Sequence, residues 1–210
     1  MRLVLDVENS VTWRDGKIFN DPFEPTNTLT QVGMLNADNH EELHIVTLDH
    51  NEAKDTSGAG RALVQSVLDM TTLLIMHNAR HDLMWLWESG FTYEGAIYDT
   101  MLAEYLLLRG QKDAIGLAAC AIRRDLAEQK EDYLSACIKK GINTNETDLD
   151  KLSLILGLTC SQLASCSTLS KQTTQPPKAS PYTPSEMSPS KPAKPLPECT
   201  CQESGWILMN

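Results

Sequence analysis

Hydrophobic residues in the first 150 positions recur in two patterns, which predict strands and helices. Short apolar runs bounded by turn residues indicate buried strands, and apolar residues three or four positions apart indicate helices that cover a sheet. Residues 12–27 are instead rich in turn formers and contain Pro22 and Pro25, which predicts a loop. The predicted strands are 2–8, 30–35, 43–48, 73–77 and 97–98, and the predicted helices are 61–70, 79–87, 100–108, 114–124 and 132–139.

The order of these elements predicts an α/β fold with a mixed sheet. The turn over 36–39 joins the second and third strands, so they are expected to form an antiparallel hairpin. The later strands alternate with helices, which is typical of parallel pairing. Thr100 is the predicted N-cap of the helix that follows the last strand. The expected architecture is therefore a sheet that is first antiparallel and then parallel, with helices on its faces.

The character of the chain changes after residue 153. Residues 171–197 contain eight of the ten prolines, separated by Ser, Thr and Lys, with no helical or strand period. Such a composition does not bury enough apolar surface to offset the entropy of ordering the chain. The sequence therefore predicts a folded domain over 1–153 and a disordered tail over 154–210.

Charge and composition narrow the class of protein. The net charge of −10 argues against a free-standing, high-affinity nucleic-acid binder, which would carry a basic face. It leaves a nuclease open, because clustered acids bind metal ions that then meet the phosphate. No apolar run approaches the ~20 residues needed to span a bilayer. The first strand is expected at the very start of the sequence, so no signal peptide is predicted. With six irregularly spaced cysteines, expected to be reduced thiols, we predict a cytoplasmic protein without a membrane partner.

The first predicted strand ends in two acidic residues, Asp6 and Glu8. Successive side chains on a strand alternate in direction, so these two project to the same side. Adjacent carboxylates repel each other unless a cation lies between them, and Mg²⁺ or Mn²⁺ takes such oxygen ligands. Asp82, which follows another strand, would supply a third carboxylate. Asp6 and Glu8 could instead be solvent-exposed residues at the end of a strand. Asp82 could instead be an acidic residue in the first turn of a helix, where the helix dipole favours a negative charge.

These motifs resemble the 3′–5′ exonuclease domain of the DNA polymerase I family, within the wider DnaQ-like (DEDD) superfamily. The family's Asp-x-Glu motif is present as Asp6–Glu8 and its Asn-x-x-x-Asp motif as Asn78–Asp82. A further segment, Asp99–Leu102, is similar to the Asp-Thr-Met-Leu stretch that opens a helix in the same enzymes. The resemblance covers residues 1–153 and implies a ribonuclease-H-like fold.

The resemblance also implies a site in which Asp6, Glu8 and Asp82 bind two Mg²⁺ or Mn²⁺ ions and catalyse phosphodiester hydrolysis. Asp6 would bridge the ions, and Glu8 would also position the attacking water. In addition to these three carboxylates, the residues implied to contact nucleic acid are Asn9, Asn78 and His81.

Simpler roles remain open for several of these positions. Asn78 is also a suitable N-cap for the helix that begins at Ala79. His81 is equally consistent with a surface residue. Asp99 is expected to fix the start of its own helix rather than bind metal.

One family feature is missing. The family completes its site with a late-helix Tyr-x-x-x-Asp, whereas Tyr133 is followed by Cys137. Restoring one thymidine after the codon of Leu154 gives, with permitted wobble bases, Tyr-Thr-Trp-Ala-Asp. Our hypothesis is that residues from about 155 onward are out-of-frame sequence without evolved structure. Activity of the chain is then expected to be impaired.

Three functions are consistent with these observations. The first is a proofreading-type exonuclease domain of the replication machinery, acting on the 3′ end of single-stranded DNA and working with a downstream polymerase domain. The second is an RNA 3′–5′ exonuclease of the RNase D type, which has the same three motifs. The third is a catalytically inactive module that binds single strands.

Overall fold

The computed structural model describes residues 1–109, 111–126 and 133–173, with side chains up to Thr168. The part of the predicted disordered tail beyond residue 173 lies outside the described residues.

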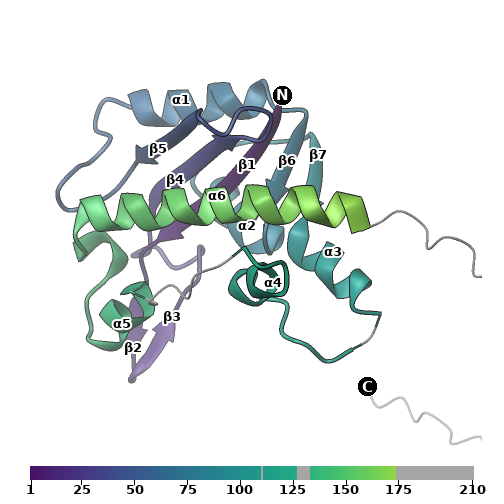
Figure 1. Ribbon diagram of the computed structural model, residues 1–210. Coiled ribbons are helices and arrows are strands. Elements are labelled where there is room, and N and C mark those ends of the chain that lie inside the picture. Colours follow the sequence, from purple (N-terminus) through teal and green to yellow (C-terminus); the bar gives the residue numbers. More distant parts are fainter. Residues whose placement is uncertain (110, 127–132, 174–210) are drawn as a thin grey trace, which may run out of the picture. The chain divides into compact units, whose positions relative to one another are not determined.

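The fold contains a five-stranded sheet in the order β5-β4-β1-β6-β7 (Figure 1). The strands of this sheet are β1 (Arg2–Asn9), β4 (Leu29–Asn36), β5 (Leu43–Thr47), β6 (Leu73–Met76) and β7 (Ala96–Asp99). The helices are α1 (Ala59–Asp69), α2 (Ala79–Glu88), α3 (Thr100–Leu107), α4 (Leu117–Arg123), α5 (Tyr133–Lys139), the short 3₁₀ turn η1 (Thr144–Glu146) and α6 (Leu149–Thr173).

The pairing of these strands confirms the predicted mixed sheet. β1 lies between an antiparallel neighbour, β4, and a parallel neighbour, β6. β5 extends the antiparallel side, and β7 extends the parallel side. This arrangement, with helices on both faces, is the ribonuclease-H-like fold that was expected. Since β1 and β6 run in the same direction, their carboxyl ends reach the same edge of the sheet.

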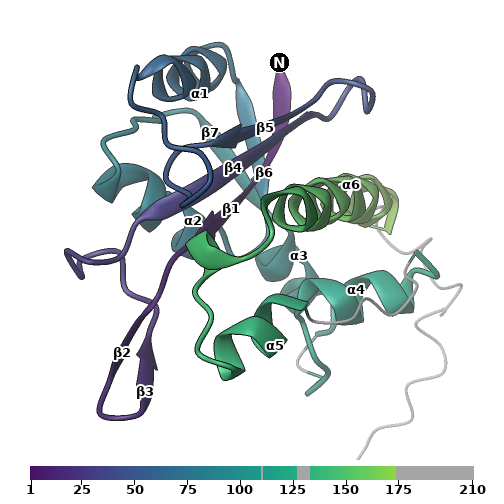
Figure 2. The same ribbon diagram turned by 90° about the vertical axis from the view of Figure 1, so that its left-hand side faces the viewer.

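Helices cover the two faces of the sheet differently. α1 and α2 pack on one face, and α6 crosses the other face (Figures 1 and 2). Alternation along β1 divides its apolar side chains between these two layers. Leu3, Leu5 and Val7 belong to the core cluster that contains α1 and α2, whereas Val4 belongs to the cluster beneath α6.

Helix α6 corrects the expectation of disorder from residue 154. The segment is helical from Leu149 to Thr173, and an apolar stripe faces the sheet. Leu152, Leu156, Cys160 and Leu163 are all fully buried, at spacings of four, four and three residues. That helical period was obscured by the Ser- and Thr-rich composition of the segment. Within the described residues, no helix is both long enough and apolar enough to span a membrane.

The region predicted as a loop over 12–27 also contains regular structure. β2 (Thr12–Arg14) and β3 (Lys17–Phe19) form an antiparallel hairpin. Its two turn residues, Asp15 and Gly16, have positive φ angles of 51° and 72°. An Asp-Gly pair favours this tight hairpin turn, so the expectation of an irregular loop at these residues was wrong.

A glycine on β4 allows α6 to approach the sheet closely. A Cβ atom at Gly33 would lie 2.8 Å from both the Sγ of Cys160 and the Cγ of Leu156. Gly33 is the partner of Asp6 in the antiparallel ladder. The helix therefore passes nearest to the sheet beside one of the acidic residues.

We predict that Gly33→Ser destabilises the protein by about 1–3 kcal/mol, because the new side chain collides with α6 in a packed layer. Urea unfolding measures the difference. Gly116→Ser is the matched control, since a Cβ atom there meets nothing within 4 Å and its φ of −63° suits serine. Equal stability of the two variants would contradict the close approach of α6.

Candidate active site

Two of the three predicted metal ligands lie on β1, under α6. Asp6 and Glu8 are half-buried. They project to the same side of β1 as Val4, whose side chain packs beneath this helix. Their ladder partners are Gly33 and Gln31. The Nε2 of Gln31 donates hydrogen bonds to Thr47 and, at 2.8 Å, to Ser153 on α6. The expectation that both carboxylates project to one side of the sheet is therefore confirmed.

The third predicted acid, Asp82, is buried in the first turn of α2. Its relative exposure is 3%, and its Oδ2 atom has no hydrogen-bond partner. Burial, followed by the negative charges of Asp6, Glu8 and Asp99, raises the pKa of Asp82 well above its ordinary value. An exposed first-turn acid would show neither feature. Asp82 therefore shares one electrostatic environment with both acids of β1.

The chemistry of these groups fits a hard divalent cation. Carboxylate oxygens are the ligands that Mg²⁺ and Mn²⁺ prefer, and a cation would compensate the buried like charges. The Oδ2 atom of Asp82 has no hydrogen-bond partner and is therefore free to coordinate such an ion. In the part of the chain that the structure describes, no three His, Cys, Asp or Glu side chains already surround one ion-sized position.

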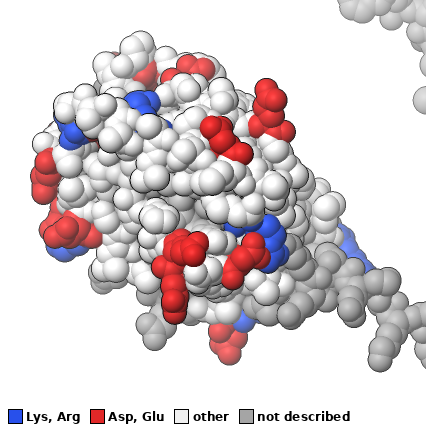
Figure 3. Space-filling view, turned by 90° about the horizontal axis from the view of Figure 1, so that it is seen from above, with Lys and Arg blue, Asp and Glu red and all other residues white. Residues whose placement is uncertain are grey.

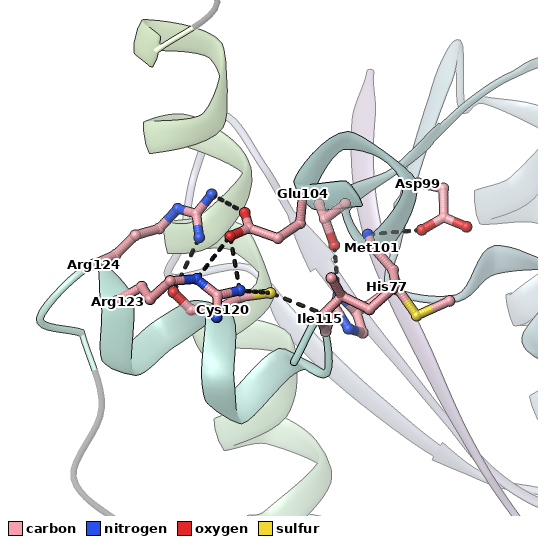
Figure 4. Close-up of polar contacts among 9 residues, drawn as sticks. His77, Asp99, Met101, Glu104, Ile115, Cys120, Arg123 and Arg124 are labelled. Atoms are coloured by element: carbon pink, nitrogen blue, oxygen red, sulfur yellow. Dashed lines mark hydrogen bonds and ion pairs between the residues drawn. The ribbon is translucent and has the colours of Figure 1, made fainter. Parts of the chain in front are cut away.

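Asp99 positions the turn that carries Asp82. Its carboxylate accepts hydrogen bonds from the backbone amides of Asn78 (3.1 Å) and Ala79 (3.0 Å), at the start of α2. It also accepts from the amide of Met101 (2.8 Å), at the start of α3 (Figure 4). A single side chain thus satisfies the exposed amides of two helix N-termini. The structural role expected for Asp99 is confirmed.

The predicted N-cap at Thr100 is wrong, because Asp99 occupies that position. Thr100 is the first residue of α3, and its hydroxyl donates to the carbonyl of Met76 at 3.1 Å. The imidazole of His77 lies 2.9 Å from the same hydroxyl. Burial lowers the pKa of His77 below its ordinary value. The end of β6 is thereby tied to α3 next to the candidate site.

Asn78 is exposed and adopts a left-handed backbone conformation, with φ of 65°. It occupies the N-cap position of α2, but its side chain makes no capping hydrogen bond. Positive φ in a non-glycine residue is uncommon and often accompanies function. The amide group of Asn78 is therefore available at the surface beside Asp82.

The other two predicted substrate contacts differ in accessibility. His81 is half-buried, its ring lies 6.4 Å from that of Trp85, and burial lowers its pKa. Asn9 is buried, and its Nδ2 group donates to the carbonyl of Ser10 (2.9 Å) and to Asn20 (2.8 Å). Both amide protons of Asn9 are used inside the protein, which favours a structural role for this residue.

An ion-pair network between α3 and the end of α4 was not expected from the sequence. Glu104 of α3 is 4% exposed and forms ion pairs with Arg123 and Arg124 at the end of α4 (Figure 4). Arg124 also donates to the carbonyl of Cys120 at 3.0 Å. Isolated charged residues in a helical pattern give no sign of such pairing. The network fixes α4 against α3, whose N-cap is Asp99.

The surface charge agrees with the acidic composition. On the face seen in Figure 3, Asp and Glu are spread over a largely uncharged surface, and Lys and Arg form only small separate spots. This face offers no continuous basic path for a phosphate backbone. Any contact with nucleic acid there would depend on groups other than clustered basic side chains.

The strand order and helix placement define the class as a ribonuclease-H-like α/β domain. The chain belongs to the 3′–5′ exonuclease family, which matches residues 24–148, more than half of its length. Asn78, Asp82 and Asp99 lie inside the matched range, whereas Asp6 and Glu8 precede it. A comparison with curated protein sequences found no significant match.

A comparison with solved structures found matches of low identity and low TM-score. The POL domain of Pol1 from M. smegmatis, in complex with DNA primer-template and dNTP, is 16% identical with a TM-score of 0.48, over 81% of this chain and 24% of that chain. NrnC from Brucella melitensis with bound Mg²⁺ is 18% identical with a TM-score of 0.41, over 81% and 85%. This chain spans about a quarter of the M. smegmatis polymerase chain.

We predict that Glu104→Gln lowers the free energy of unfolding by about 2 kcal/mol at neutral pH, because the half-buried Arg124 and the more exposed Arg123 lose the buried carboxylate that pairs with them. Burial alone would raise the pKa of Glu104, but hydrogen bonds from Arg124 and Arg123 outweigh it and lower the pKa. The stabilisation is therefore complete above the ordinary value near 4.5 and is lost as the pH falls through the lower folded pKa.

Urea unfolding between pH 3 and pH 7 tests this prediction. The difference between wild type and Glu104→Gln should shrink towards the acidic end. Replacement of the exposed Glu41 by Gln is the control and should have little effect at any pH. A difference that stays constant across the range would show that the charge of Glu104 is not what stabilises this network.

Proposed function

We propose that this 3′–5′ exonuclease removes nucleotides from the 3′ end of single-stranded DNA, with Asp6, Glu8 and Asp82 as its metal ligands. One observation carries the proposal. The buried Asp82 keeps an unpartnered oxygen while it experiences the charges of the two acids on β1. A protein interior does not normally hold such a group unless a cation or a proton neutralises it.

Each residue has a distinct part in the proposed reaction. Asp6 and Glu8 are held by the central strand, which keeps their separation fixed, and Glu8 would orient the attacking water. Asp82 would bind from the first turn of α2, which Asp99 holds in place. When bound, two Mg²⁺ or Mn²⁺ ions would supply activation of that water and stabilisation of the leaving 3′ oxygen.

The exposed amide of Asn78 and the ring of His81 are the proposed contacts for the terminal nucleotide. Both lie on the turn that leads to Asp82, so a nucleotide held by them would meet the carboxylates. Asn9 is less suited to this role, because its amide protons are already bonded. His81 would act as a neutral group near pH 7, since burial lowers its pKa.

The remaining parts of the proposal concern the cellular role of the domain, its partner and its reading frame. We propose that the domain serves DNA replication in the cytoplasm, beside a polymerase domain that presents the single strand. Presentation by a partner agrees with the net charge of −10. The buried Leu156, Cys160 and Leu163 of α6 argue against the part of the frame-change hypothesis that expects no structure from residue 155 onward. The frame change itself stays a prediction, and sequencing the DNA across codons 150–175 tests it. An intact reading frame with no downstream polymerase frame would refute it.

Trimming of a 5′-labelled single-stranded DNA oligonucleotide in Mn²⁺ or Mg²⁺ tests the assignment. Asp82→Asn should reduce the rate by about 100-fold or more, which is typical when a group that stabilises transition-state charge is lost. Asp69→Asn, at an exposed acid of α1, is the control and should trim like wild type. Unchanged trimming by Asp82→Asn would remove Asp82 from the active site.

A matched RNA oligonucleotide of the same sequence separates the proposed substrate from its alternative. Faster trimming of DNA is expected. Faster trimming of RNA would instead favour the RNase D type of enzyme. Binding of single strands without any trimming, in both metals and by both wild type and the Asp69→Asn control, would indicate an inactive binding module.

A further inference from the structure

The β2–β3 hairpin and the loop after it carry large apolar side chains that remain in contact with solvent. Trp13 is 37% exposed, Ile18 49%, Phe19 38% and Phe23 61%. Two of the three phenylalanines of the chain belong to this segment. Neighbouring exposed apolar side chains mark interaction sites on soluble proteins. The hairpin is therefore a candidate contact surface outside the carboxylate site.

The strand register divides the hairpin side chains between two faces. Trp13 and Ile18 are cross-strand partners, so they project to the same face. Arg14 and Lys17 are the next pair and project to the other face. Figure 2 shows the hairpin extending away from the five-stranded sheet. The Trp13–Ile18 pair thus forms a small apolar face that is open to solvent.

The base of the hairpin is fixed at the acidic end of β1. Trp13 follows Glu8 by five residues, which is at most about 17 Å along an extended chain. Asn143, just before η1, accepts a hydrogen bond from the amide of Val11 at 2.9 Å and donates to its carbonyl at 2.7 Å. Asn27 donates to a carbonyl at the end of β3 at 3.0 Å. These bonds hold the hairpin as an ordered extension beside the carboxylates.

The charge of the hairpin differs from that of the whole chain. It contains two cations, Arg14 and Lys17, and one acid, Asp15, which gives a net charge of +1, whereas the chain carries −10. Arg14 is paired with Glu24. None of the ion pairs among the described residues includes Lys17, which is exposed. Proteins that bind single strands combine such a cation with an aromatic side chain on which a base stacks.

We propose that the Trp13–Ile18 face binds the single strand upstream of its 3′ terminal nucleotide, with a base stacked on the indole of Trp13 and a phosphate contacted by Lys17. The inference rests on the proposed function and adds the path of the strand away from the carboxylates. Stacking buries the exposed indole against the flat face of a base. Lys17 is next to Ile18, and its long, flexible side chain reaches past the edge of the hairpin towards a phosphate.

Binding of a 5′-labelled ten-nucleotide DNA strand in low-salt buffer with EDTA, followed by fluorescence anisotropy, tests the proposal without any cleavage. Trp13→Ala should weaken binding roughly 5- to 100-fold, which is the range for loss of one base–aromatic stack. Trp13→Tyr keeps an aromatic ring and should retain most of the affinity. Trp87→Ala removes an exposed indole of α2 and is the matched control. Equal affinities of Trp13→Ala and Trp87→Ala, or no binding by wild type, would overturn the proposal.

A strand with abasic sites at the second to fifth nucleotides from its 3′ end tests the same contact in the wild-type protein. These positions fall within 17 Å at ~3.4 Å per nucleotide. The abasic strand should bind wild type as weakly as the intact strand binds Trp13→Ala, and this variant should bind both strands alike. Equal binding of intact and abasic strands by wild type would overturn the stacking platform and assign this face to a protein partner instead.

The salt dependence of the same binding tests the phosphate contact. Lys17→Gln should reduce the slope of log affinity against log salt concentration by about 0.7, which corresponds to one phosphate contact on a single strand. Trp13→Ala should leave the slope unchanged. Lys112→Gln, at an exposed lysine after α3, is the control and should also keep the wild-type slope. A wild-type slope in Lys17→Gln would overturn the role of this lysine.

The two proposals fail in different ways. Trimming that requires Asp82, but is the same in wild type, Trp13→Ala and Lys17→Gln on a ten-nucleotide strand below saturation, would refute only the hairpin contact. Strand binding that requires Trp13, without trimming in either metal, would refute the proposed reaction and leave the hairpin contact intact.

Discussion

The structure depends on one electrostatic constraint, which is the burial of a carboxyl group among like charges. Asp82 lies in the interior with a free oxygen, and the charges of Asp6 and Glu8 act on it together with the loss of solvent. Without a cation, such a group is tolerated by retaining its proton. A divalent ion would remove the conflict and convert the arrangement into a functional site. The metal hypothesis follows from this conflict rather than from the motif alone.

The fold creates this constraint through strand direction. Because β1 and β6 are parallel neighbours, the acids at the end of β1 lie beside the turn from β6 into α2. Asp99, at the end of the next parallel strand, then holds the first amides of both α2 and α3. On the other face, Gly33 lets α6 approach the acids of β1. Three separate segments of the chain thus contribute to one small region.

The sequence predicted the parts of this structure that depend on local pattern. The five sheet strands, the antiparallel hairpin and the helices after them follow from apolar runs and turn residues. The β2–β3 hairpin was recognisable from Asp15-Gly16, but prolines nearby favoured a loop. Helix α6 was missed because its buried stripe, which includes Leu156 and Cys160, lies within a Ser- and Thr-rich segment. The bond from Asp99 to α2 and the approach of Cys160 to Asp6 arise only from tertiary packing, which no local pattern encodes.

Calorimetric titration of Mn²⁺ into wild type and Asp82→Asn tests the central claim most directly. The account predicts saturable binding to wild type and at least a tenfold loss of affinity, about 1.4 kcal/mol, in the variant. A folded Asp82→Asn protein that binds Mn²⁺ as tightly as wild type, or a wild-type protein that binds none, would show that these carboxylates do not form a metal site.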